Sequence, residues 1–146
     1  MSQTLEEEVN KPIHYNNHKS GIEAIEVTRW LPFDLGNAWK YLMRYLSKKY
    51  DTKSTQKKDL LKVNWYMTDF LTNFIDPMSC ESTMKFDLPE HVGMMMWLIY
   101  ETEDVSAVKD MFKEIIDIVT AGGIINPVRI KEKMDALKTY AESFED

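Results

Sequence analysis

Hydrophobic and polar positions follow the period of an α-helix along most of the chain. Apolar side chains recur three and four positions apart in six segments, residues 20–31, 35–50, 55–75, 87–101, 103–120 and 126–143. This spacing places the apolar side chains of each segment on one helical face. The runs VGMMMWLIY and GGIINPV do not alternate over enough residues to predict a strand. The pattern predicts an all-α protein, a bundle of about six helices.

The ends of these segments carry residues that start or stop helices. Ser20 and Glu23 have the spacing of a capping box, and Pro32 limits the helix that they open. Thr55 is the predicted cap of the third helix, which stops before Pro77. The later boundaries are predicted from Asp87 before Pro89, Gly122 and Gly123 after the fifth helix, and Asn126 before Pro127. These signals favour separate helices joined by short links.

The turn-prone loop at residues 76–87 divides the chain into two parts. Residues 1–13 are polar and acidic and are expected to form a flexible lead, and residues 14–75 then form a unit of three helices. Residues 76–146 form an acidic helical extension, which either completes the same compact domain or serves oligomerisation. The adaptable apolar cluster Met94, Met95, Met96 and Trp97 is expected in the core or in an oligomer interface.

The second predicted helix has two contrasting faces. At 100° per residue, one arc of about 120° presents cations and hydrogen-bonding groups: Lys40, Tyr41, Arg44, Ser47 and Lys48. Much of the opposite side is apolar: Trp39, Leu42, Met43, Tyr45 and Leu46. The apolar face is therefore expected to pack, and the cationic face to meet solvent or a ligand.

Charge is distributed unevenly along the chain. The formal net charge is -6, yet residues 37–62 contain eight Lys or Arg side chains and only two acidic ones. Residues 76–146 contain seven basic and fifteen acidic side chains. Overall acidity argues against nonspecific binding of duplex nucleic acid, but a local cationic segment still suits a small anion.

Several classes of protein are excluded or disfavoured by what the sequence lacks. Cys80 is the only cysteine of the 146 residues, so neither an internal disulfide nor a cysteine-based zinc cluster can form in one chain. The N-terminus does not resemble a signal peptide, and no apolar run approaches a membrane span; we expect a cytosolic protein. The P-loop motif and Ser/His/Asp hydrolase motifs do not occur, so phosphate chemistry must use cations on helices.

Lys40, Arg44 and Lys48 form one ridge at i, i+4 and i+8. Like charges at this spacing cost a helix a few tenths of a kcal/mol per pair unless an anion or an acidic partner compensates. One interpretation is a phosphate site, to which the backbone N–H groups of Gly36 and Asn37 at the helix start would add donors. The other is a solvated face, or one neutralised by acids of the C-terminal half.

The stretch KPIHYNNH is a second candidate for ligand contact. Pro12 holds the chain extended, so His14 and Tyr15 are placed to lie across the bundle and contact a base or a phosphate. His14 and His18 are four positions apart, but a zinc site is disfavoured because no third ligand is nearby.

Acidic residues offer a possible metal site. Glu23 and Glu26 lie three positions apart and would hold Mg²⁺ together with another acid, as E-x-x-E pairs do in helical nucleotide pyrophosphohydrolases. Glu23 also has the capping role as an explanation. Asp59 stands among lysines, where it would orient one of them or a metal, or form an ion pair within its helix.

Four ordered blocks, VNKPIHY, GIEAIEV, GNAWKYLMRYLSKK and KKDLLKVNWYM, cover about residues 9–70. They resemble a family of small bacteriophage proteins long labelled uncharacterised, which includes a nucleotide kinase that phosphorylates deoxynucleoside monophosphates without a P-loop. Where that family commonly turns after the arginine of the second helix, Tyr45, Leu46 and Ser47 predict that the helix continues.

The resemblance implies a nucleotide kinase of the host cytoplasm during phage infection, with its site residues at the motif positions of the family. Residues 14–75 would be the nucleotide-binding unit of a homo-oligomer, with ATP as phosphate donor and Mg²⁺ as cofactor. The implied catalytic residues are Lys40, Arg44 and Asp59, with Glu23 and Glu26 as metal ligands. The implied ligand-binding residues are His14, Tyr15, Asn37, Lys40, Tyr41, Arg44, Lys48, Lys62 and Tyr66.

Three other functions stay open from the sequence. The same cations suit a non-enzymatic protein that sequesters a nucleotide or nucleotide messenger. The acidic pairs suit a Mg²⁺-dependent nucleotide pyrophosphohydrolase. The acidic C-terminal half suits a helical inhibitor of a host protein, which would not need Arg44.

Overall fold

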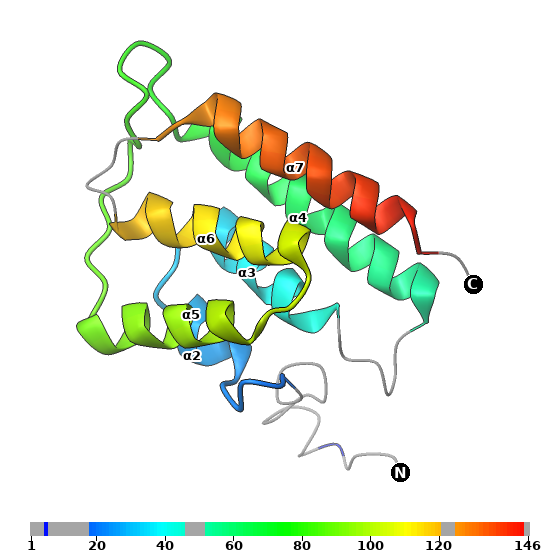
Figure 1. Ribbon diagram of the computed structural model, residues 1–146. Helices are drawn as coiled ribbons and strands as arrows, with labels where there is room; N and C mark the ends of the chain where they lie inside the picture. Colours follow the sequence, from blue (N-terminus) through cyan, green and yellow to red (C-terminus); the bar gives the residue numbers. More distant parts are fainter. Residues whose placement is uncertain (1–4, 6–17, 46–51, 121–124, 145–146) are drawn as a thin grey trace.

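A computed structural model describes residues 5, 18–45, 52–120 and 125–144, and within them the all-α prediction is confirmed (Figure 1). The named helices are α2 (Ala24–Thr28), α3 (Phe33–Arg44), α4 (Lys53–Asn73), α5 (Glu90–Thr102), α6 (Ser106–Thr120) and α7 (Pro127–Glu142). The described part of the chain contains no β-strand, only an isolated antiparallel bridge between Ile75 and Ser82 in the predicted loop.

The helices surround one hydrophobic core to which both parts of the chain contribute. The long helices α4 and α7 lie side by side, and α3 packs against α4 and also contacts α6 (Figure 1). Trp39 of α3 meets Phe112 of α6 edge to face, with ring centroids 4.7 Å apart. Tyr45 is also fully buried and donates a hydrogen bond to Glu103 Oε2 over 3.4 Å. Residues 76–144 therefore cover the helices of the first part.

The first helix is shorter than predicted and begins later. Its capping box is formed by Glu23 and Glu26, not by Ser20 and Glu23, and α2 ends at Thr28. Ser20 instead accepts a hydrogen bond from the Ile22 backbone N–H and contacts His18 Nδ1 at 2.7 Å. Because the Ser20 hydroxyl is used in this local turn, it does not cap a helix.

The second helix begins and ends earlier than predicted. Pro32 is its N-cap rather than the end of the preceding helix, and α3 starts at Phe33 instead of Leu35. Tyr45 is the C-cap, so the prediction that the helix continues past the arginine is wrong at Tyr45, and the rest of that prediction, residues 46–50, lies outside the described residues. Proline occurs at helix starts, where its fixed φ fits, and just beyond helix ends, where its missing N–H cannot continue the hydrogen bonding, so Pro32 alone does not distinguish the two.

Two other caps differ from the prediction by a few residues. Thr52, not Thr55, caps α4, because the Thr52 hydroxyl accepts a hydrogen bond from Thr55 N–H. Pro89, not Asp87, is the N-cap of α5. The Asn126 cap of α7 is confirmed: its side chain accepts from Arg129 N–H. The predicted stop at Gly122 and Gly123 lies outside the described residues.

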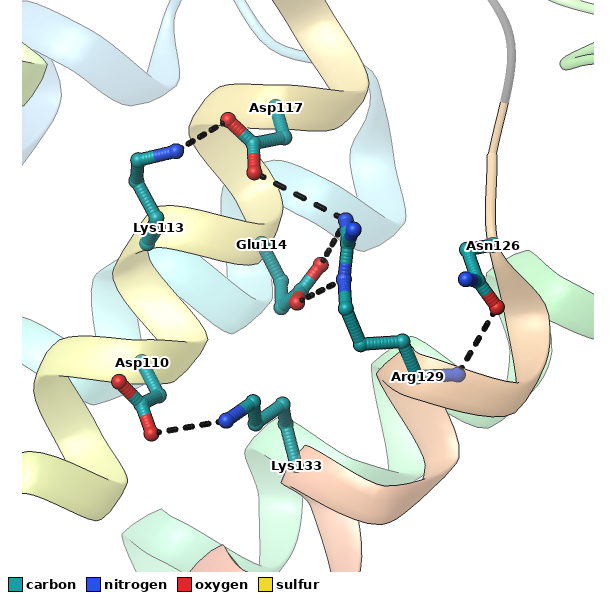
Figure 2. A network of polar contacts seen from close by, with 7 residues as sticks. All are labelled: Asp110, Lys113, Glu114, Asp117, Asn126, Arg129 and Lys133. Atoms are coloured by element: carbon teal, nitrogen blue, oxygen red, sulfur yellow. Dashed lines mark hydrogen bonds and ion pairs between the residues drawn. The ribbon is translucent and has the colours of Figure 1, made fainter.

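A network of ion pairs joins α7 to α6 (Figure 2). Arg129 donates from Nε and Nη2 to the two carboxylate oxygens of Glu114, over 2.8 and 3.0 Å. Glu114 is only 4% exposed, so this two-point contact compensates a carboxylate that has lost most of its water. Lys133 reaches Asp110 at 3.2 Å, and Lys113 reaches Asp117 at 2.7 Å. Asp110, Glu114 and Asp117 are thus paired with cations of the same half of the chain.

The methionine cluster of α5 is divided between core and surface. Met96 is fully buried, whereas Met94 is 62% and Trp97 44% exposed. None of the helices in the described residues is long and apolar enough to cross a membrane.

Candidate functional site

Most of the predicted ligand-binding residues that the structure describes lie where α3 packs against α4. We call this line the α3–α4 seam and define it by Lys40, Tyr41, Arg44, Asp59, Lys62 and Tyr66. The opposite face of α3 is buried, as its periodicity predicts: Trp39, Leu42 and Met43 are at most 5% exposed. The burial of that face turns the cationic side of α3 toward the outer edge of α4.

Three cationic groups surround one aromatic ring at the middle of the seam. Lys40 Nζ lies 4.6 Å and Lys62 Nζ 4.9 Å from the centroid of the Tyr41 ring, and the guanidinium carbon of Arg44 lies 5.7 Å from it. Each contact is within the range of a cation–π interaction, which stabilises a cation but does not neutralise it. Helical spacing predicted the two cations of α3, and the family resemblance implied Lys62; the packing of α3 on α4 brings all three to one ring.

Arg44 is held by an acid of the neighbouring helix. Its Nε lies 3.6 Å from Asp59 Oδ2, and the Asp59 side chain is 2% exposed. Asp59 was predicted to act on a lysine or a metal, or to pair within α4; the structure adds an ion pair with Arg44 of α3. The contact uses one edge of a guanidinium that has five N–H donors in a planar fork. A fork of this kind matches a phosphate.

An aromatic cluster occupies the end of the seam near the start of α3. Tyr66 stacks on Tyr41, with centroids 6.1 Å apart and planes 10° from parallel. Phe33 and Trp65 meet Tyr66 edge to face, at 5.8 and 5.1 Å. Burial raises the pKa of the Tyr66 hydroxyl, and nearby Tyr41 and Asp34 raise it further. Tyr66 was predicted as a ligand contact; Phe33 and Trp65 were missed, although Trp65 falls on the polar face of a helix.

Two carboxyl groups meet at the same end of the seam. Asp34 is 4% exposed and interacts with Asp69, and both line a cavity of about 110 Å³ with the phenylalanines Phe33, Phe70 and Phe74. Burial, with the contact and charge of Asp69, raises the pKa of Asp34 from 3.8 to about 6. Sequence reasoning missed this pair because residues far apart in the chain give no spacing signal.

Gly36 and Asn37 do not offer the free donors predicted for them. Because α3 starts at Phe33, the Gly36 N–H lies within the helix and donates to Pro32 O over 2.8 Å. The Asn37 side chain donates to Phe33 O over 2.9 Å. The prediction that backbone N–H groups at this point bind a phosphate is therefore wrong for Gly36.

The two glutamates predicted to hold Mg²⁺ serve the start of α2. Glu26 Oε2 accepts a hydrogen bond from Glu23 N–H over 2.7 Å, and the two side chains form a reciprocal capping box. Within the described ranges, no group of three or more His, Cys, Asp or Glu side chains is arranged to hold a metal ion. Each of the two carboxylates accepts a backbone hydrogen bond, and no third His, Cys, Asp or Glu of the described ranges joins them, so they do not fit a protein-held magnesium site.

Three predicted contacts lie outside the described residues: His14, Tyr15 and Lys48. The structure brings together Lys40, Tyr41, Arg44, Asp59, Lys62 and Tyr66, and adds Phe33, Trp65, Asp34 and Asp69 at one end. In chemical terms, the seam has a cationic part that suits an anion and an aromatic part that suits a flat ring.

Comparison with known proteins places the first part of the chain in relation to one family. No curated protein and no solved structure matches the chain. Residues 9–68 match the model of a family described as a protein of unknown function, DUF3310. The matched segment contains α2, α3 and most of α4, and with them every residue of the α3–α4 seam.

Proposed function

We propose that the protein binds a nucleotide through its phosphate at the α3–α4 seam and acts as a nucleotide kinase on deoxynucleoside monophosphates. The observation that carries the proposal is the gathering of Lys40, Arg44 and Lys62 around the Tyr41 ring. The kinase activity comes from the resemblance of residues 9–70 to a phage family that includes such an enzyme.

The electrostatics of the seam favour an anionic ligand. Like charges brought close together repel, and the Arg44–Asp59 pair offsets part of that repulsion. A phosphate monoester carries about two negative charges at neutral pH and accepts charge-assisted hydrogen bonds from lysine and arginine. Binding a phosphate therefore relieves repulsion within the seam and adds strong donor–acceptor contacts.

The same residues suit phosphoryl transfer, which depends mainly on positioning and charge neutralisation. An oxygen of the bound monophosphate attacks the γ-phosphorus of ATP; a P–O bond forms, the bond to the bridging oxygen breaks, and ADP leaves. Lys40, Arg44 and Lys62 would neutralise the charge on the phosphates, and Asp59 would position Arg44. Mg²⁺ adds further neutralisation in such reactions; since Glu23 and Glu26 do not fit a metal site, we assign no step to it.

Binding is tested by calorimetric titration of the full chain with each deoxynucleoside monophosphate. We expect Lys62→Ala to weaken binding about tenfold, because it removes one charged contact worth about 1.5 kcal/mol. Lys62 is exposed, so the variant should fold normally. Lys113→Ala on α6 is the matched control, since Lys113 is 39% exposed and pairs with Asp117 of its own helix rather than with a residue of the seam.

Arg44 needs a paired substitution because Asp59 is buried beside it. Arg44→Gln with Asp59→Asn removes the charge from both partners and leaves polar groups of similar size. We expect this double variant to fold, as judged by circular dichroism, and to lose nucleotide binding. Unchanged affinity in both the double variant and Lys62→Ala would overturn the proposed site.

Sequestration without catalysis is the second candidate function. The observation in its favour is that Glu23 and Glu26 are occupied in the capping box, whereas capture by lysine and arginine needs no metal. Incubation with deoxynucleoside monophosphates, ATP and Mg²⁺ separates the two: a kinase forms diphosphates, and a sequestering protein binds equally well in EDTA and forms none. Release of pyrophosphate from triphosphates would instead identify a pyrophosphohydrolase.

A further inference from the structure

Two large aromatic side chains stand exposed at one end of the α3–α4 seam. Phe33 is 73% and Trp65 64% exposed, and each meets the ring of Tyr66 with its edge. Single exposed apolar residues are ordinary on protein surfaces. Two of them flanking one partly buried tyrosine, beside three cations, form a more specific arrangement.

The contacts along the seam give it a direction. Phe33 and Tyr41 of α3 both contact Tyr66 of α4, Tyr41 contacts Lys62, and Arg44 contacts Asp59. Residue numbers thus increase along one helix as they decrease along the other, so the two helices are antiparallel. The aromatic cluster lies at the Phe33 end, and the Arg44 ion pair lies at the other end.

We propose that Phe33, Trp65 and Tyr66 receive the base of the bound nucleotide, while its phosphate lies toward Lys62 and Arg44. This inference rests on the proposed function and specifies it: the ligand must carry a flat heterocyclic ring as well as an anionic group. Every nucleobase has a π-face that stacks on aromatic side chains, so the cluster favours nucleotides over sugar phosphates without selecting one base.

The length of the seam agrees with a ligand of two parts. Phe33 and Arg44 are the first and last residues of α3, a helix of 12 residues. At 1.5 Å per residue they are separated by roughly 16 Å along the helix axis. Tyr41 and Lys62 lie between the two ends, so a nucleotide that stacks at Phe33 directs its phosphate toward the cations.

The test compares ligands with and without a base on the full chain. Calorimetric titration with the four deoxynucleoside monophosphates and with 2-deoxyribose 5-phosphate measures what the base contributes. We expect at least one monophosphate to bind about tenfold or more tightly than the sugar phosphate, the size of effect that base stacking gives. The double variant Phe33→Ala and Trp65→Ala should lose that advantage while its affinity for the sugar phosphate stays unchanged.

Controls separate stacking from general effects of removing an aromatic residue. Trp65→Phe keeps a stacking surface and should retain most of the affinity for the monophosphate. Trp97→Ala removes a tryptophan that is also partly exposed, on α5, and should leave both affinities as they were. All three substituted side chains, Phe33, Trp65 and Trp97, are at least 44% exposed, which favours normal folding of the variants.

Failure of this inference is distinguishable from failure of the proposed function. If monophosphates and the sugar phosphate bind equally well and the aromatic substitutions have no effect, the proposed base site at Phe33, Trp65 and Tyr66 is overturned. The proposed phosphate site is then unaffected. No binding of either ligand overturns both. If the double variant has a different molar mass in light scattering but unchanged affinities, a second copy of the chain covers the aromatic residues. The proposed base site is then overturned as well.

Discussion

At the scale of single residues, Asp34 and His18 couple protonation to folding in opposite directions. The pKa of Asp34 is raised to about 6, mainly by burial, and that of His18 is lowered to about 4 by burial and by the neighbouring charge of Lys19. Between about pH 4 and 6, folded Asp34 binds a proton that the unfolded chain has released. Over the same range, the unfolded chain protonates His18 and the folded protein does not.

These shifts predict opposite pH profiles for two variants. Asp34 makes the free energy of unfolding fall as pH rises from about 4 to 6, whereas His18 makes it rise between about pH 4 and 6.5. As pH rises from about 4 to 6, the free energy of unfolding of the Asp34→Asn variant should therefore increase by about 1–2 kcal/mol. That of the His18→Gln variant should decrease by a similar amount. Urea unfolding at a series of pH values measures both.

The wild-type profile should be flatter than that of either variant, because the two contributions oppose each other. Asp135→Asn, an exposed substitution on α7, is the control and should follow the wild type. Parallel profiles for Asp34→Asn and the wild type would show that Asp34 titrates with its ordinary pKa.

At the scale of helices, the sequence predicted their number and their buried faces better than their ends. The buried face of α3 and the Asn126 cap of α7 follow from local periodicity and turn chemistry. The start of α2 could not be predicted in this way, because Ser20 and Glu23 each stand three residues before a glutamate and so both have the spacing of a capping box. The choice depends on His18, whose ring engages the Ser20 hydroxyl, and the sequence gives no sign of that contact.

The contact between α6 and α7 yields a prediction about stability. Arg129→Ala should lower the free energy of unfolding by about 2 kcal/mol, because it leaves the buried Glu114 carboxylate without its two charged hydrogen bonds. Arg129 is itself 46% exposed, which keeps the loss below that of a fully buried pair.

Lys138→Ala is the matched control for this helix. Lys138 and Glu142 lie 3.9 Å apart with both side chains more than half exposed, so removing the lysine should change stability by less than about 0.5 kcal/mol. Chemical denaturation of both variants decides the matter. Equal losses would mean that the Arg129 contact contributes no more than a surface ion pair.

At the scale of the whole molecule, part of the candidate site followed from sequence and part did not. The cations of α3 were predictable from helical spacing, since one helix sets their relative positions. Asp59 beside Arg44, and the exposed pair Phe33 and Trp65, depend on how α3 and α4 are packed together. Contacts between helices have no fixed spacing in the sequence, so periodicity alone cannot supply them.

The shared core predicts that the N-terminal part does not fold alone. Trp39 packs on Phe112, Tyr45 contacts Tyr140 and Glu103, and all of these partners lie beyond residue 76. A fragment of residues 1–75 should therefore show little helical circular dichroism and no cooperative thermal transition, because it exposes apolar surface that the full chain buries. Adding residues 76–146 as a separate chain should restore helicity; a cooperatively folded fragment would refute the prediction.

The side of α4 turned away from the seam has a consequence for relatives of this protein. On that side, the Asn64 side chain donates a hydrogen bond to Met134 O of α7 over 2.8 Å. Asn64 lies within the segment that matches the family, and Met134 lies beyond it. A homologue with only the segment that matches residues 9–68 would lack α7, which here covers part of α4. Another segment of such a homologue, or a second copy of its chain, would have to cover the apolar surface of α4 that α7 buries in this protein.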